Sequence, residues 1–384
     1  MGIPVGKLAL YTACAGIAPS ACLPVTIDVG TNNEALLKDS LYIGLPQRRL
    51  RGAAYDEFID EFVTAVQHAF PRALIQFEDF GTQNAFRLLA KYRERVRAFN
   101  DDIQGTAAVV LAGLYSALRV TNRPLRDQTF VFCGAGEAGT GIADLLVVAM
   151  GQEGLPTAEA RARCWFMDSK GLVVKGRADL AEHKRPYAHD HECLSNLLAA
   201  LDRIRPTVLI GASGTPGLFT QAVLQRMGQI NERPVIFALS NPTSKSECTA
   251  EAALQVTGGR ALFASGSQFG PVSVGAKTFL PGQANNSYIF PGVGLGVVAS
   301  GSRLVTDEMF LSAARALAAE TSGADLEQGR LYPSLKRIRE VSLAIAASVA
   351  ELAYARGLAA VPRPDDLRSY VKAQMYEPNY PSYV

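Results

Sequence analysis

A glycine-rich turn between an apolar run and a helix-like segment constrains the fold most strongly. The turn is Gly134-Ala135-Gly136-Glu137-Ala138-Gly139. It follows the run Thr-Phe-Val-Phe-Cys at 129–133 and precedes an apolar segment at 141–148. A strand, a glycine turn and a helix N-terminus direct backbone N–H groups and the helix dipole at a pyrophosphate. The G-x-G-x-x-G match alone is weak, but this setting makes it strong. We therefore predict a dinucleotide-binding domain in which the turn residues contact the cofactor; the alternative is a glycine turn without a ligand.

The acidic residue that ends the second strand of such a domain is predicted to be Asp168, in Cys-Trp-Phe-Met-Asp at 164–168. It lies farther from the glycines than the usual spacing of about 20 residues, which a long intervening helix and loop would allow. Asp168 would then face the adenosine ribose. Hydroxyl and cationic side chains nearby favour a 2′-phosphate, and hence NADP, with NAD as the alternative. These side chains are Ser169, Lys170, Lys184 and Arg185, unless they form an ordinary solvated loop.

Two acidic couplets about one helix apart predict a metal site. The first lies in Phe-Glu-Asp-Phe-Gly at 77–81 and the second in Phe-Asn-Asp-Asp-Ile-Gln-Gly at 99–105. Flanking hydrophobic residues would hold each couplet at the edge of a core. Carboxylates are hard ligands and no Cys/His cluster has zinc spacing, so Mg²⁺ or Mn²⁺ is expected, with Glu78, Asp79 and Asp102 as ligands. The alternative is ordinary carboxylates at helix ends.

Helical patterns and short β-rich runs alternate along most of the chain, which indicates an α/β fold with a largely parallel sheet. Helical patterns at 306–320 and 335–356 follow without further strands. We therefore predict a Rossmann-type doubly wound domain at 101–285, inserted in a second α/β domain made of residues 1–100 and a helical return at 286–384. The expected strands lie at 25–29, 73–77, 208–210, 234–239 and 261–264.

Composition limits the class of protein. The 384 residues are 48% hydrophobic and 19% charged, enough for a large core and two domains. The net charge is +2 and no basic run alternates with aromatic residues, so nucleic acid is not an expected partner. Apolar stretches such as 107–118 are too short to span a bilayer, and the first residues lack a secretory pattern. The six cysteines show no pairing pattern, which indicates buried thiols in a soluble, intracellular protein.

Several motifs together resemble one known family, the malic enzymes, which are decarboxylating malate dehydrogenases. The resemblance covers essentially the whole chain. Besides the two acidic motifs, it is carried by Gly-Ile-Pro-Val-Gly-Lys-Leu at 2–8, Ile-Asp-Val-Gly-Thr-Asn-Asn at 27–33, Leu-Ser-Asn-Pro-Thr at 239–243 and Pro-Gly-Gln-Ala-Asn-Asn at 281–286. It implies oxidation of L-malate by NADP⁺ or NAD⁺, metal-assisted loss of CO₂ and tautomerisation to pyruvate.

The resemblance also implies roles for individual residues. Lys7 matches the lysine that takes the proton from the malate hydroxyl, and burial beside a cation would lower its pKa. Asp101 matches a neighbouring carboxylate that would orient Lys7 or share its proton, and Glu78, Asp79 and Asp102 match the metal ligands.

Three asparagines complete the predicted site. Asn241 and Asn286 match substrate contacts and Asn285 matches a cofactor contact. For these residues alone, the alternative is that each caps a turn after a strand.

The family has a further N-terminal region that supplies a tyrosine general acid and an arginine for the malate carboxylate, and neither has a counterpart here. We expect this to lower activity on the order of 10²–10⁴-fold. The alternative function is an impaired nucleotide-binding protein that acts only as a partner of full-length subunits. A third possibility, a dehydrogenase acting on amino acids, does not need the acidic couplets. The family implies a homo-oligomer, dimer or tetramer; cytoplasm is expected, with the mitochondrial matrix as the alternative.

Overall fold

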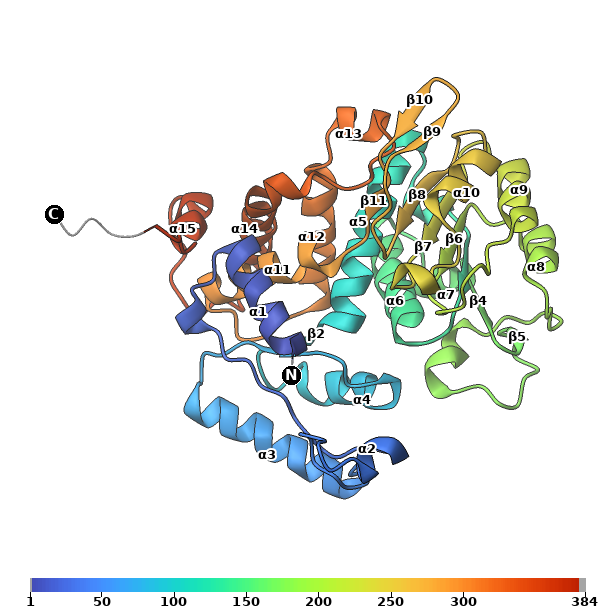
Figure 1. The fold of residues 1–384 in the computed structure, drawn as a ribbon. Coiled ribbons are helices and arrows are strands. Elements are labelled where there is room, and N and C mark those ends of the chain that lie inside the picture. The colour runs from blue at the N-terminus through green and yellow to red at the C-terminus, as the bar shows by residue number, and fades with distance from the viewer. Residues whose placement is uncertain (1, 380–384) are drawn as a thin grey trace.

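The computed structural model describes residues 2–379, apart from the side chains of Thr82 and Glu137. Its largest element is a seven-stranded sheet with the order β11-β8-β7-β6-β3-β4-β5, on the right of Figure 1. Every neighbouring pair is parallel except β4 and β5. The strands are β3 (Phe130–Cys133), β4 (Cys164–Asp168), β5 (Gly171–Leu172), β6 (Val208–Gly211), β7 (Val235–Ala238), β8 (Leu262–Ser265) and β11 (Gly282–Gln283). The predicted α/β class is confirmed.

Side chains alternate between two buried faces of this sheet, as the two-residue period of a strand requires. Phe130 and Phe132 of β3 belong to the core under α5 and α6, whereas Val131 and Cys133 belong to the core under α8, α9 and α10. Helices therefore cover both faces, so the predicted doubly wound arrangement is confirmed. The helices are α5 (Thr106–Thr121), α6 (Glu137–Gln152), α7 (Thr157–Ala162), α8 (Leu197–Ile204), α9 (Gln221–Ile230) and α10 (Ala250–Val256).

The order of the strands places a ligand site. From β3 the chain first builds β4 on one side and later β6, β7 and β8 on the other. The direction of winding reverses between β3 and β6, and ligands bind such sheets outside the carboxyl ends of the strands at the reversal. The glycine turn leaves β3 at that point.

A smaller unit lies beside the large sheet, at the bottom of Figure 1. Its strands β1 and β2 form a two-stranded parallel sheet with Phe77 opposite Asn100. Tyr55, Ile59 and Leu88 from α3 and α4 close its core. The elements of the first hundred residues are α1 (Gly2–Ala15), α2 (Glu34–Lys38), α3 (Ala53–Ala69), β1 (Ile75–Phe77), α4 (Thr82–Tyr92) and β2 (Ala98–Asn100).

The C-terminal helices pack against the start of the chain. Tyr11 of α1 contacts Phe290 of α11, with ring centroids 5.0 Å apart, and Ala15 shares a core with Leu295 and Ala346. The two long helices fall on the predicted patterns, while the domain limits at 100 and 285 stay a prediction. The remaining elements are the hairpin β9 (Val272–Val274) and β10 (Lys277–Phe279), then α11 (Phe290–Ser300), α12 (Asp307–Ala319), α13 (Gly323–Glu327), α14 (Ile338–Ala355) and α15 (Leu367–Ala373).

The strand expected at 25–29 is wrong. This segment is extended but belongs to no strand. Its backbone neighbours are in the loop at 47–50: Leu50 N–H donates to Val29 O and Thr31 N–H donates to Gln47 O. The Asp28 side chain accepts hydrogen bonds from Gly30 N and Leu45 N. β-branched composition needs a continuous partner ladder to become a strand, and these two bonds to the loop at 47–50 do not form one.

Burial qualifies two further expectations. The segment Asp101–Thr121 is the one described helix long and apolar enough to cross a bilayer, but 78% of its most apolar window is buried inside the fold.

All six cysteines are free. Cys193 is exposed and Cys22 partly buried, so the expectation of buried thiols is wrong for Cys193.

Candidate active site

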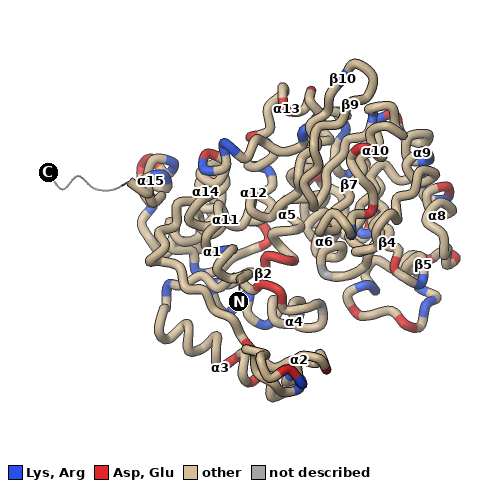
Figure 2. Tube along the Cα trace, in the orientation of Figure 1, with Lys and Arg blue, Asp and Glu red and all other residues tan. Residues whose placement is uncertain are grey.

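The two acidic couplets leave the same edge of the small sheet. Because β1 and β2 are parallel and in register, Glu78-Asp79 and Asp101-Asp102 emerge side by side. Figure 2 shows the acidic segments together beside β2 and α4. Asp102 Oδ2 accepts a 2.8 Å hydrogen bond from Asp79 N, which ties the couplets to each other. The predicted juxtaposition of these carboxylates is therefore present.

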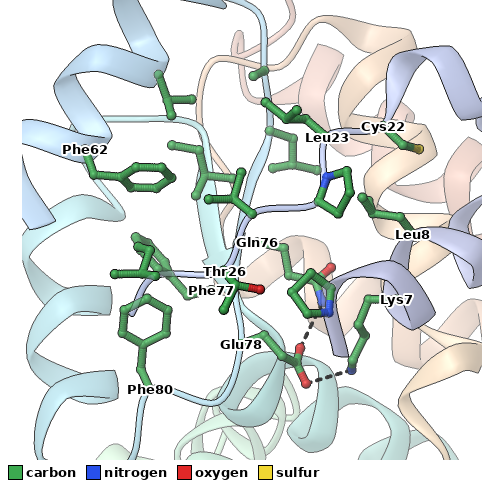
Figure 3. A pocket seen from close by; sticks show the side chains of 18 of the residues that line it. Lys7, Leu8, Cys22, Leu23, Thr26, Phe62, Gln76, Phe77, Glu78 and Phe80 are labelled. Atoms are coloured by element: carbon green, nitrogen blue, oxygen red, sulfur yellow. Dashed lines mark hydrogen bonds and ion pairs between the residues drawn. The ribbon is translucent and has the colours of Figure 1, made fainter. Parts of the chain in front are cut away.

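Lys7 lies between the couplets. Its ammonium is 3.0 Å from Glu78 Oε1 and 2.5 Å from Asp101 Oδ2, and it sits over the Phe290 ring. Figure 3 shows Glu78 reaching both Lys7 and Gln76, whose Nε2 donates to Glu78 Oε2 at 3.0 Å. The arrangement places the Lys7 ammonium, from α1, beside Glu78, the candidate metal ligand that follows β1.

Asp101 is fully buried in a short π-helical turn, Asp101–Gly105, that leads into α5. Asn286 Nδ2 donates to its backbone oxygen and to Oδ2, each at 3.2 Å. The other carboxylate oxygen, Oδ1, is buried without a hydrogen-bond partner in the described part of the chain. A Cβ on Gly105 would lie 1.8 Å from that oxygen, which explains the glycine. The orphaned acceptor indicates a missing partner of positive character.

The charged groups of this cluster shift one another's pKa values. Burial lowers the pKa of Lys7, but attraction to Asp101 and Glu78 outweighs it, so the pKa is raised and the ammonium is favoured. Burial, together with repulsion from Asp101 and Asp102, raises the pKa of Glu78 to about 7. Burial also raises the pKa of Asp101, against the opposing effect of Lys7. The expected lowering of the Lys7 pKa concerns a site that holds a cation, and it stays a prediction.

The donor set fits a divalent cation in its chemistry. Glu78 and Asp101 pair with Lys7, and the couplets add the carboxylates of Asp79 and Asp102, which leaves excess negative charge and only hard oxygen ligands. Their side chains do not yet converge: no group of three or more acidic, His or Cys side chains in the described residues could hold a metal as arranged. Asp79 has φ of 58°, a conformation that is unusual outside glycine and occurs at ligand sites.

The glycine turn after β3 is shaped for close packing. Gly134 has φ of 114°, and a Cβ there would lie 2.3 Å from Ala212 O; a Cβ on Gly139 would lie 2.4 Å from Gly134 O. At Gly136 a Cβ would meet nothing within 4 Å, so this backbone faces open space at the start of α6. Ala138 is half-buried in the first turn, and the side chain of Glu137 lies outside the described residues.

Asp168 ends β4 as predicted, but cations occupy its carboxylate. Arg177 donates to both oxygens at 2.9 and 3.0 Å, and Lys184 donates to Oδ2 at 2.7 Å. Although burial acts in the opposite direction, these bonds lower the pKa of Asp168 to about 2. Arg177 was not predicted, because eight residues, including β5, separate it from Asp168. Ser169 and Arg185 are exposed in the same region.

The predicted asparagines divide between two regions. Asn286 lies beside Asp101 and Thr106. Asn285 instead caps the turn that follows it, because its side chain accepts a hydrogen bond from Ser287 N at 2.9 Å. Asn241 is exposed in the loop after β7. The capping interpretation therefore applies to Asn285, and Asn286 is the asparagine that the fold brings to the Lys7 cluster.

A cavity of about 1650 Å³ opens beside this cluster. Lys7, Glu78 and Asp79 are among the residues that line it. Figure 3 shows Lys7 and Glu78 at one end and the apolar side chains of Phe62 and Leu23 farther along. His183 stacks on Phe86 of α4, and its Nε2 lies 3.0 Å from Ala135 O in the glycine turn. The smaller unit and the nucleotide turn are therefore linked through His183.

A doubly wound sheet with this glycine turn, next to a lysine held among carboxylates, defines a two-domain dinucleotide-binding oxidoreductase. The family model for the malic enzyme NAD-binding domain matches residues 103–354, and that for the malic enzyme N-terminal domain matches residues 1–93. The chain belongs to the malic enzyme family.

Individual relatives agree with this assignment. The NADP-dependent malic enzyme of Rattus norvegicus is 56% identical over 383 residues, 99% of this chain and 67% of the relative. A human NADP-dependent malic enzyme described as mitochondrial is 54% identical over 387 residues, 100% of this chain and 64% of the relative. The crystal structure of Entamoeba histolytica malic enzyme superposes with a TM-score of 0.74 at 26% identity, covering 96% of this chain and 68% of that one.

Proposed function

We propose that the chain catalyses the oxidative decarboxylation of L-malate to pyruvate and CO₂, with NADP⁺ as acceptor and Mg²⁺ or Mn²⁺ as cofactor. One observation carries the proposal: Lys7 is held between Glu78 and the buried Asp101 at the edge of the large cavity. When bound, the cation would polarise the malate oxygens and the nicotinamide would accept the hydride.

The chain's own residues have separate tasks. Lys7 Nζ holds or takes the proton of the malate hydroxyl, and Asp101 keeps Nζ in place from its buried position. Glu78, Asp79 and Asp102 would hold the cation. In this structure Glu78 pairs with Lys7. If Glu78 bound the cation instead, Lys7 would lose one of the two attractions that raise its pKa.

Substrate and nucleotide contacts complete the proposal. Asn286, which already donates to Asp101, and Asn241 would bind malate, and Asn285 with the glycine turn would bind the nucleotide. Lys184 and Arg185 support NADP over NAD, because Asp168 is neutralised by Arg177 and Lys184 and does not present a free carboxylate to a ribose. We further propose domains at 1–100, 101–285 and 286–384, a homo-oligomer, and a cytoplasmic location with the mitochondrial matrix as the alternative.

The test is NADPH formation by the purified chain with malate and Mn²⁺, with NAD⁺ in parallel and circular dichroism to establish folding. We expect turnover that stops on chelation and falls in Asp102→Asn by on the order of 10²-fold or more. The exposed Glu340→Gln on α14 serves as the control and should keep the parent rate. Metal-independent turnover would contradict the proposal. Folded protein that binds NADP without turnover would support the alternative of a non-catalytic partner.

A further inference from the structure

A buried carboxylate outside the Lys7 cluster joins two loops at the carboxyl edge of the large sheet. Glu247 has no exposed surface. It forms no ion pair among the described residues, so hydrogen bonds must offset the loss of water around its charge. Four donors from two serines do this, and each serine belongs to a different loop. Ser213 follows β6 and Ser240 follows β7.

The positions of these donors require a carboxylate at residue 247, because both of its oxygens must accept hydrogen bonds. Glu247 Oε1 accepts from Ser213 N at 3.0 Å and from Ser213 Oγ at 3.2 Å, and Ser240 Oγ donates to it at 2.5 Å. Glu247 Oε2 accepts from Ser240 N at 3.3 Å. A hydroxyl can turn, but the two backbone N–H groups cannot, and they point at different oxygens. A glutamine would necessarily direct its NH₂ group at one of them.

The fold leaves room for this carboxylate and links it to the nucleotide turn. A Cβ on Gly211, the last residue of β6, would lie 2.5 Å from Glu247 Cδ. The next residue, Ala212, is the one whose carbonyl packs on Gly134, and Ser240 Oγ also accepts from Gly214 N at 2.8 Å. Glu247 therefore fixes the loop that supports the nucleotide turn relative to the loop that continues into Asn241.

We propose that Glu247 is a positioning residue for hydride transfer: it holds the loop after β6, which supports the nucleotide, in register with the loop after β7, which carries Asn241. The proposal rests on the proposed function for the identity of the substrate. Misplacing reacting groups by about 1 Å can lower a rate on the order of 10²-fold, so a small shift between the two loops is sufficient to be measured.

The variant Glu247→Gln keeps the size of the side chain and removes one acceptor. We expect kcat/KM for malate to fall on the order of 10- to 100-fold while the Kd for NADP stays unchanged. We also expect a larger primary deuterium isotope effect with malate deuterated at C2, because hydride transfer becomes slower relative to other steps. Amide hydrogen exchange at 211–214 and 239–243 should become faster in both segments.

A matched control is Asp325→Asn on α13, which also accepts from the N–H and hydroxyl of a serine, Ser322, but lies away from the site. It should change neither the kinetics nor exchange in the two loops. If Glu247→Gln does not fold, Ser240→Ala removes one donor and should shift the same readouts less. Exchange and isotope effects equal to those of the control would overturn the proposal, as would parallel losses of folding, NADP binding and turnover. No turnover by the parent chain would overturn the proposed function, and the exchange rates would still decide the role of Glu247.

Discussion

At the scale of single residues, Glu78 has two competing partners. Its carboxylate now pairs with Lys7, and its pKa of about 7 means that protons compete with any cation near neutral pH. A raised carboxyl pKa favours the protonated form below that pH, so cation affinity should rise as pH increases through 7.

This competition gives a direct test by Mn²⁺ titration with electron paramagnetic resonance. Between about pH 6 and about pH 8 we expect the affinity to increase about tenfold, which is the change in the ionised fraction of a group with this pKa. Glu78→Gln should bind more weakly and lose most of the pH dependence, whereas Glu340→Gln should behave like the parent chain. Equal affinities at both pH values in the parent chain would exclude Glu78 as a ligand.

The residues that sequence patterns could identify are those that lie next to each other in a motif. Glu78, Asp102 and the glycine turn belong to this group. Arg177 and Glu247 do not, because their partners are seven residues or more away and only the fold brings them together. Sequence patterns did not single out Lys7 for the same reason. Nothing around it in the sequence indicates burial between Glu78 and Asp101, so its proposed role came from the family resemblance.

At the scale of elements, β3, the glycine turn and α6 form one rigid unit in which two glycines have different tasks. Gly134→Ala would place Cβ 2.3 Å from Ala212 O at a φ of 114°, so we expect loss of stability of about 1–3 kcal/mol as well as weaker nucleotide binding. Gly136→Ala meets nothing within 4 Å and should keep its stability while a methyl group obstructs the nucleotide. Urea unfolding and NADP calorimetry measure the two effects. Equal stability losses in both variants would contradict this division.

Elements with strong local patterns could be predicted, and those that depend on partners could not. β6, β7 and β8 are central strands with continuous apolar runs, so the runs alone located them. The segment at 25–29 is rich in β-branched residues but includes Thr26 and Asp28, and it forms no ladder with a neighbouring strand. The π-helical turn that buries Asp101 has no sequence pattern of its own, because it results from packing between β2 and α5.

At the scale of the whole molecule, nucleotide binding should stabilise both parts together, since His183 contacts Phe86 and the glycine turn at once. At a concentration of 100 times Kd we expect NADP to add about 2.7 kcal/mol to the free energy of unfolding. NADP should stabilise more than NAD at equal concentration, and Lys184→Gln should reduce the difference. Thermal unfolding with each nucleotide measures this. Equal stabilisation by NAD and NADP would remove the argument for NADP preference.

The packing of α1 on α11 and α14 also bears on the order in which the protein is made. Lys7 leaves the ribosome long before Phe290, whose ring lies beneath its ammonium and which begins α11. Contacts between such distant segments form slowly, because the intervening chain must be closed first. During translation α1 therefore lacks its final partners, while the nucleotide-binding sheet can already assemble. The contact between Lys7 and Phe290 can therefore form only after α11 has been made.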